Sequence, residues 1–227
     1  MTLLTNERAT PTSRLVRIAL EGRTFVYHAG QSANVGVEDA AALTPYSIAS
    51  APCETAQHGW LEFLVKVDGS SRFGAVVSDL PVGTPIVIDG PAGSFTLPET
   101  LASHHCLFVA GGTGIAPLRS MIRQILCGGS GVRVDLLYAA RRPDEFAYLD
   151  ELQGLARTGD LSLAPTLTGE AEDWVHGRGR PGITHLATLV HRDTLAFLCG
   201  PRGMVVDVTA ALAAIGLPRD RIRSEEW

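Results

Sequence analysis

A short glycine-rich stretch between two apolar segments carries the clearest chemical signal in the sequence. VAGGTGIAP, residues 109–117, joins an apolar run of strand type to an apolar run with helical spacing. Glycines let backbone N–H groups approach a phosphate closely, and the start of a helix adds a favourable dipole. Pro117 breaks the G-x-G-x-x-G pattern, although proline costs little in the first turn of a helix. The stretch predicts a nucleotide-phosphate site at Gly112, Thr113 and Gly114, with an ordinary tight turn as the alternative.

A second stretch of the same construction, FLCGPRGM, occupies residues 197–204. A buried strand again runs into a glycine and a proline, Gly200 and Pro201, before a helix. In a parallel sheet ligands bind beyond the carboxyl ends of the strands, which predicts that Cys199 lies at the same edge as Thr113. A buried structural cysteine is the alternative, and for a lone cysteine it is the more common one.

The surrounding patterns place both stretches in the second of two regions. Early in the chain, short β-rich runs separated by turn residues favour an antiparallel barrel or sandwich. These runs are 14–20, 25–30, 60–67 and 85–90, with one short helix near 73–80. Later, apolar strands alternate with helical segments, which indicates a parallel sheet covered on both faces. We therefore predict an antiparallel β-barrel over residues 1–98 and a Rossmann-like α/β domain over residues 99–227.

Composition and charge argue against several classes of protein. The chain has 227 residues and a net charge of -5, so nucleic acid is not expected as its main partner. No apolar run approaches the roughly 20 residues of a membrane helix, and the N-terminus does not resemble a signal peptide, so a cytoplasmic protein is expected. Disorder is not expected beyond the first dozen residues, which are polar. Because the four cysteines lack metal-binding spacing, we expect no metal site and only free thiols. We expect His104 and His105, which precede a strand, to lie at the surface.

Five motifs occur in one order along residues 14–227: PYSIAS, GPAGSF, GGTGIAP, CGPRGM and a terminal IRSEEW. In this the chain resembles the ferredoxin–NADP reductase superfamily of flavin oxidoreductases. The resemblance implies a flavin-binding barrel followed by a nicotinamide-nucleotide domain, with FAD and NADH or NADPH as cofactors. It implies hydride transfer from the nicotinamide to flavin N5, chemistry that belongs to the cofactors. Because the chain has no cluster cysteines, electrons are expected to pass to a separate acceptor, a ferredoxin or an oxygenase component.

The resemblance also implies roles for residues at matching positions. Ser47, Cys199 and Glu225 are implied as orienting and polarising groups where the hydride passes. The implied contacts to the flavin are Tyr46, Ser47, Ile48, Ser50, Glu225 and Trp227. The implied contacts to the nucleotide are Gly112, Thr113, Gly114, Pro117, Cys199, Gly200, Pro201 and Met204. An aromatic ring at Trp227 would cover the flavin until the nicotinamide binds; an ordered tail packed on the barrel is the alternative.

Two positions depart from the family pattern and weaken the implied hold on the flavin phosphates. Most relatives carry an arginine where Thr44 stands, and a serine or threonine near the start of the short barrel helix where Gly74 stands. One charged hydrogen bond is worth about 1.5–3 kcal/mol. Arg72, which precedes Phe73 and Gly74, is the candidate to supply the missing charge, with a solvated loop arginine as the alternative.

The identity of the nucleotide donor depends on a few arginines. Arg141 and Arg142 follow a strand where relatives that prefer NADPH often carry an arginine, which suits a 2′-phosphate. Those relatives also carry a Ser-Arg pair after the next strand, where this chain has Thr168 and Gly169. We expect NADH.

Two other functions fit the sequence. A flavin reductase that releases its flavin would suit weak phosphate anchoring, although such enzymes usually keep the arginine that Thr44 replaces. A non-catalytic scaffold or regulatory subunit would depend on Thr44 and Gly74 alone. Intact Ser47, GGTG and CGPRGM count against that reading.

Overall fold

The computed structural model describes residues 1–227 except 39–41, 68, 70, 102–104, 130 and 227. It divides into two compact units, Met1–Leu97 with Arg119–Gly128 and Pro98–Leu118 with Gly129–Trp227. Helix α3 (Ile115–Cys127) therefore begins in the second unit, and its later turns belong to the first. The sequence gives no sign of this, because a helical pattern does not tell which unit its apolar face packs on. The division into domains 1–98 and 99–227 stays a prediction.

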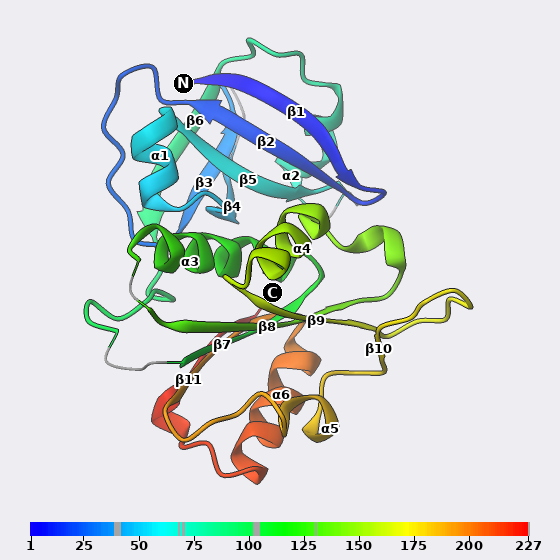
Figure 1. The fold of residues 1–227 in the computed structure, drawn as a ribbon. Coiled ribbons are helices and arrows are strands. Elements are labelled where there is room, and N and C mark those ends of the chain that lie inside the picture. Colours follow the sequence, from blue (N-terminus) through cyan, green and yellow to red (C-terminus); the bar gives the residue numbers. More distant parts are fainter. Residues whose placement is uncertain (39–41, 68, 70, 102–104, 130, 227) are drawn as a thin grey trace. The chain divides into compact units, whose positions relative to one another are not determined.

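Six antiparallel strands close on themselves in the first unit (Figure 1). One sheet has the order β1 (Thr2–Thr10), β2 (Ser13–Ala19), β5 (Trp60–Lys66), and the other has the order β4 (Thr44–Ser47), β3 (Ser32–Val37), β6 (Ile86–Ala92). Isolated bridges join the two sheets at both edges, Thr2 with Pro85 and Ile48 with Phe63. Closure removes the exposed edges that an open sheet would present. The predicted antiparallel barrel is confirmed.

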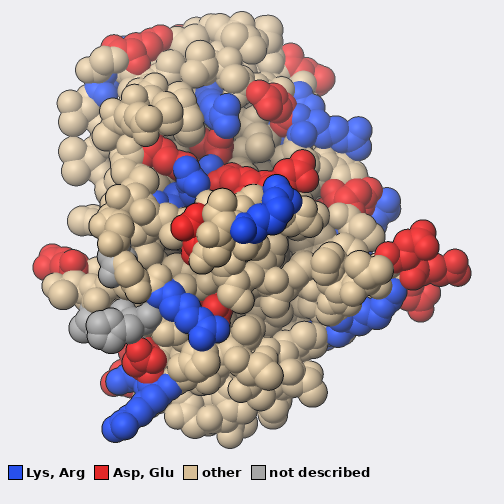
Figure 2. All heavy atoms as spheres, viewed as in Figure 1, with Lys and Arg blue, Asp and Glu red and all other residues tan. Residues whose placement is uncertain are grey.

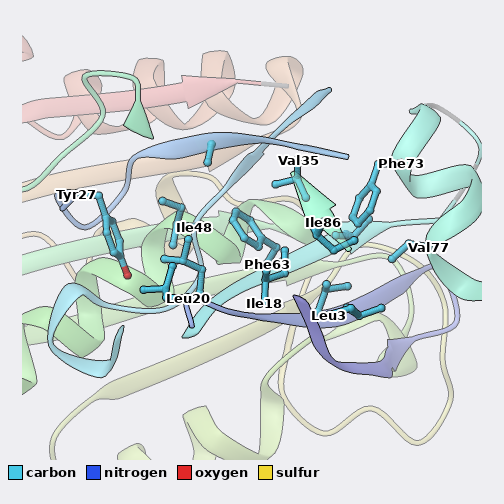
Figure 3. Packing of buried hydrophobic residues seen from close by; sticks show 14 residues of the cluster. Leu3, Ile18, Leu20, Tyr27, Val35, Ile48, Phe63, Phe73, Val77 and Ile86 are labelled. Atoms are coloured by element: carbon cyan, nitrogen blue, oxygen red, sulfur yellow. The ribbon is translucent and has the colours of Figure 1, made fainter. Parts of the chain in front are cut away.

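Alternate side chains of these strands fill the barrel, as the two-residue period of a strand requires. Figure 3 shows Ile18, Phe63 and Ile86 meeting inside it, and the first two have no exposed surface. Helix α2 (Arg72–Val76) and the 3-10 turn Val77–Asp79 add Phe73 and Val77 to the same core. Burying a side chain of this size is worth about 1.5–3 kcal/mol. The core therefore holds α2 at a fixed place beside β3 and β5.

One sequence prediction for this unit is wrong, the strand over residues 25–30. The first dozen residues, where the sequence left disorder open, are ordered, because β1 pairs with β2 along its length and places the fully buried Leu3 in the core. Residues 25–30 form no strand, although Tyr27 and Ala29 are buried at alternate positions. That alternation reflects anchoring of a loop, since the Tyr27 hydroxyl donates to the carbonyl of Ser50 at 2.9 Å. Helix α1 (Pro52–His58) was also not predicted.

A six-stranded parallel sheet forms the second unit, with the strand order β10-β9-β8-β7-β11-β12. The strands are β7 (His105–Gly111), β8 (Arg133–Ala140), β9 (Ser162–Leu167), β10 (Gly177–Arg178), β11 (Thr194–Gly200) and β12 (Ile222–Glu226). Figure 1 shows α5 (Ile183–Leu186) and α6 (Arg202–Ala214) on one face and α4 (Leu149–Thr158) on the other. Helices on both faces explain why the strands read as continuous apolar runs. This part of the fold prediction is confirmed.

Acidic and basic side chains are interspersed on the face of the molecule shown in Figure 2. Among the described helices, none is both long and apolar enough to cross a bilayer. On this face the acidic side chains lie among basic ones and do not form one acidic patch.

A disulfide between Cys53 and Cys127 corrects the expectation that all cysteines are free thiols. The two residues are 74 positions apart in sequence and meet because α1 and the end of α3 both belong to the first unit. A contact at that separation leaves no local pattern in the sequence. Cys106 and Cys199 are free and buried.

Breaking this disulfide should lower the free energy of unfolding by about 2–4 kcal/mol, because the bond restricts the unfolded chain. Cys53→Ser tests this in thermal melts run with and without a reductant. The melting temperature of the wild type should fall in reductant toward that of the variant, whose own value should not move. A wild type that is insensitive to full reduction of the bond would contradict the prediction.

Candidate functional site

The predicted flavin-facing stretch forms β4 and the residues just after it. Thr44 to Ser47 pair antiparallel with Val35 to Ser32 of β3. Tyr46 and Ser47 are half-buried, whereas Ile48 and Ser50 have no exposed surface. Tyr46 and Ser47 thus keep exposed surface that a ligand could contact, whereas Ile48 and Ser50 support the strand from the interior of the first unit.

Two neighbours from the start of α2 fix the ring of Tyr46. Its hydroxyl shares a hydrogen bond with Oγ of Ser71, and the ring of Phe73 lies edge-on to it with centroids 6.0 Å apart. Ser71 is the N-cap of α2, and its Oγ accepts the backbone N–H of Gly74 at 3.0 Å. Ser71 was not among the predicted site residues. A serine directly before a short helical segment is an N-cap signal that could have found it.

Gly74, where the family resemblance leads us to expect a hydroxyl side chain, has no room for a side chain. A β-carbon at Gly74 would lie 2.2 Å from the carbonyl oxygen of Lys66. The hydroxyl at this end of α2 comes from Ser71 instead, one turn earlier. Arg72 is the first residue of α2 and is exposed, while Thr44 is half-buried at the start of β4. Replacement of the missing arginine by Arg72 stays a prediction.

In the second unit, the strand order reverses between β7 and β11. From β7 the chain moves outward to β8 and β9 on one side, then returns to build β11 and β12 on the other. Such a switch point opens a crevice beyond the carboxyl ends of the two strands, and ligands of parallel sheets bind there. GGTG follows β7 and CGPRGM follows β11, so both predicted motifs flank the switch point.

The two glycine turns at the switch point are in direct contact. A β-carbon at Gly114 would lie 2.3 Å from the carbonyl oxygen of Cys199, and one at Gly111 would lie 2.7 Å from Sδ of Met204. Gly112 adopts φ 53°, a conformation that favours glycine. The structure therefore brings together the predicted nucleotide residues Gly112, Thr113, Gly114, Cys199, Gly200, Pro201 and Met204. Pro117 is buried in the first turn of α3.

Tyr138 supports the first of these turns and was not predicted. Its buried hydroxyl donates to the carbonyl of Gly112 at 3.1 Å and accepts the N–H of Ala147 at 3.1 Å. A polar ring at the end of an otherwise apolar strand, LLYAA, was the available signal. Tyr138 thus ties the GGTG turn to the loop that follows β8.

Cys199 lies at the carboxyl end of β11 between Ala110 of β7 and Glu225 of β12. The thiol is buried, and this burial, with the carboxylate of Glu225 nearby, raises the pKa of Cys199. It stays protonated at neutral pH, which suits a packing and polarising role and excludes a thiolate nucleophile. Glu225 is half-buried; Trp227 lies outside the described residues.

The two arginines after β8 each have a carboxylate partner. Arg142 donates from Nε and Nη2 to the two oxygens of Asp144, at 3.1 Å each. Nε of Arg141 lies 3.8 Å from Oε2 of Glu145. Both arginines are exposed, so these are surface pairs whose main effect is to offset local positive charge.

His105 is buried, which corrects its predicted surface position; His104 lies outside the described residues. The ring of His105 makes hydrogen bonds with Oδ2 of Asp135 at 3.1 Å and with Oγ1 of Thr194 at 2.7 Å. His105, Asp135 and His191 hold ligand atoms within 4.8 Å of one another. Arg133 already donates to both oxygens of Asp135, which opposes a cation there. The cluster joins the amino ends of β7, β8 and β11, the opposite edge of the sheet from the glycine turns.

Comparison with known proteins agrees with this geometry. Residues 108–210 match the family model described as the oxidoreductase NAD-binding domain. The chain is 32% identical over 231 residues to ferredoxin–NADP reductase B of Sorangium cellulosum, covering 91% of this chain and 88% of that protein. It is 33% identical over 184 residues to the reductase component of propane 2-monooxygenase of Rhodococcus jostii, covering 72% of this chain but only 46% of that protein. The crystal structure of the Amycolatopsis cytochrome P450 reductase GcoB superposes with a TM-score of 0.87 at 25% identity, covering 99% of this chain and 68% of that one.

Proposed function

This chain belongs to the ferredoxin–NADP reductase family of oxidoreductases, and we propose that it transfers a hydride from NAD(P)H to FAD and passes the electrons to a protein acceptor. The contact between the GGTG and CGPRGM turns at the switch point carries this proposal. Glycines in these turns put no side chain in the way of a phosphate that approaches the backbone N–H groups. FAD, when bound, supplies the redox chemistry by accepting the hydride.

The residues of the chain have the tasks of binding and orienting. Tyr46 offers a flat ring held at its hydroxyl by Ser71, which suits stacking against a flavin. Ser47 follows it on β4 and is proposed to polarise the flavin near N5. Cys199 is proposed to lie beside the nicotinamide at the switch point, and Glu225 is proposed to meet the flavin ring. Cys199, protonated and packed, contributes shape and polarity there, and no step needs it as a base.

The acceptor is proposed to be a ferredoxin or an oxygenase component. The matched relatives from Rhodococcus and Amycolatopsis are named as reductases of a monooxygenase and of a cytochrome P450. The chain spans about half the length of the first of these, 46%. The chain's own cysteines do not provide a cluster, since Cys53 and Cys127 are bonded to each other and Cys106 and Cys199 are buried. A cytoplasmic location is part of the proposal.

The absorption spectrum of the purified protein tests the function. A stoichiometric flavin band that survives desalting and bleaches on anaerobic addition of NADH is expected. Loss of flavin on desalting, with NADH-driven reduction of added flavin, would instead support a flavin reductase. A protein that binds no flavin under any loading condition would refute the proposal.

NADH is the proposed donor, because the carboxylates of Asp144 and Glu145 offset the charges of Arg142 and Arg141. An acidic residue after the second strand of a dinucleotide fold favours a ribose hydroxyl, whereas a free arginine favours a 2′-phosphate. We expect kcat/KM for NADH to exceed that for NADPH by about tenfold, which is the effect of one charged contact to the 2′-phosphate. The double variant Asp144→Asn, Glu145→Gln should lower this NADH-to-NADPH ratio, because it raises kcat/KM for NADPH. An unchanged ratio in that variant would contradict the proposed role of the carboxylates.

A further inference from the structure

Two side chains of α3 hold the backbone that follows Tyr46 and Ser47. Nη1 of Arg119 donates to the carbonyl of Ala49 at 2.8 Å, and Oγ of Ser120 donates to the carbonyl of Ser50 at 2.6 Å. Both side chains are buried. All these contacts lie within the first unit, which includes residues 119–128.

The guanidinium of Arg119 is itself fixed by buried carboxylates. Nη1 donates to Oε2 of Glu54 at 3.0 Å and lies 3.6 Å from Oε1 of Glu62. Burial by itself would raise the pKa of Glu54, but the charge of Arg119 and the N–H of Ala51 outweigh it, and the pKa lies below its ordinary value. Glu54 is therefore ionised at neutral pH. Its Oε2 also accepts the N–H of Ala51 at 2.9 Å, so one carboxylate holds both the arginine and the chain.

Ser50 lies at the centre of the same arrangement. Its carbonyl accepts from the Tyr27 hydroxyl as well as from Ser120, and its Oγ accepts the N–H of Glu62 at 3.1 Å. The N–H of Ala49 donates to the carbonyl of Glu62 at 2.7 Å. Residues 49–51 are thus held by side chains and backbone from several parts of the first unit, and α3 supplies two of those bonds.

We propose that Arg119 and Ser120 are positioning residues, which fix residues 49–51 and thereby the orientation of Tyr46 and Ser47 toward the flavin. The inference rests on the proposed function, because it takes Tyr46 and Ser47 as the flavin contacts. One residue, Ile48, separates Ser47 from Ala49, and its side chain is packed without exposed surface in the barrel core. A close-packed interior transmits a displacement instead of absorbing it. A shift of the Ala49 carbonyl therefore moves Ser47.

Ser120→Ala and Arg119→Lys in the full chain test the proposal. The first removes one donor; the second keeps the charge near Glu54 but loses the planar fork that reaches Ala49 and Glu54 together. We expect FAD to bind about threefold to tenfold more weakly, the effect of one hydrogen bond. With FAD saturating, the flavin absorption band should shift and reduction by NADH should slow by about tenfold to a hundredfold, as for a displaced reacting group.

Arg123→Gln is the matched control, because Arg123 also pairs with Glu54, at 2.8 Å, from the next turn of α3. It should lower the melting temperature while the flavin band and the reduction rate at saturation stay as in the wild type. If Ser120→Ala and Arg119→Lys behave in the same way, their role is structural and the positioning role is refuted while the proposed function stands. A wild type that binds no flavin would refute the proposed function, and the positioning role with it.

Discussion

Replacing Gly114 by alanine should reduce kcat/KM for the nicotinamide donor by on the order of a hundredfold. The added β-carbon would lie 2.3 Å from the carbonyl oxygen of Cys199 and 2.9 Å from the backbone nitrogen of Gly200. Both atoms are backbone, so the strain can be relieved only by moving the GGTG turn away from the end of β11. Overpacking of this kind costs about 1–3 kcal/mol. The displacement falls on the two turns proposed to hold the nucleotide, so binding and hydride transfer should both suffer.

Stopped-flow reduction of the flavin by NADH measures this effect, and a thermal melt shows how much of it is unfolding. Gly154→Ala is the matched control, because Gly154 lies inside α4 and its nearest contact would be the flexible end of Arg157 at 3.9 Å. Alanine is favoured over glycine in a helix interior by about 0.5–1 kcal/mol, so this variant should be at least as stable as the wild type and equally active. A Gly114→Ala enzyme that is reduced at the wild-type rate would mean that the nucleotide binds elsewhere.

The contact between the GGTG turn and the end of β11, which Gly114→Ala probes, was partly predictable from the sequence. Apolar runs alternating with helical segments indicate a parallel sheet, and in such a sheet a turn after one strand meets a turn after its neighbour. That reasoning predicted Thr113 and Cys199 at one edge, and the structure places them there. It did not predict how closely the turns approach, because the sequence does not specify the packing distance between β7 and β11.

The features that the sequence did not reveal depend on residues far apart in the chain. Cys53 meets Cys127 across 74 positions, and Arg119 reaches Ala49 across 70. Gly74 suggested a lost hydroxyl because the family pattern places a hydroxyl at that position, whereas the fold supplies the hydroxyl of Ser71 one turn earlier. Periodicity reports which face of an element is buried and does not report what that face touches. Buried polar partners such as His105 and Asp135 are therefore where sequence reasoning was weakest.

That buried pair should contribute stability that is lost in acid. Asp135 is fully buried, and burial alone would raise its pKa, but hydrogen bonds from His105 and Arg133 outweigh this and lower the pKa. A carboxyl whose pKa is lower in the folded than in the unfolded state stabilises the fold above its unfolded pKa, which is about 3.9. The stabilisation is therefore fully present at neutral pH. It is lost as the pH falls below the unfolded pKa of about 3.9 and through the lower pKa of Asp135 in the folded protein.

Asp135→Asn should separate the stabilisation by the ionised Asp135 carboxylate from the other causes of unfolding in acid. The amide has the same shape but no charge, so Arg133 and His105 lose their ionised partner, and about 3–5 kcal/mol of stability should be lost at pH 7. Near pH 3 the variant should lie closer to the wild type, because below about pH 3.9 the unfolded chain takes up a proton at Asp135 and the wild type loses part of this stabilisation. Urea unfolding curves at both pH values measure the difference. Asp144→Asn, which removes the carboxylate of an exposed pair, should cost less than about 1 kcal/mol at either pH. If Asp135→Asn lowers stability equally at pH 7 and pH 3, the loss comes from packing and not from the charge, and the buried pair does not make the fold acid-sensitive.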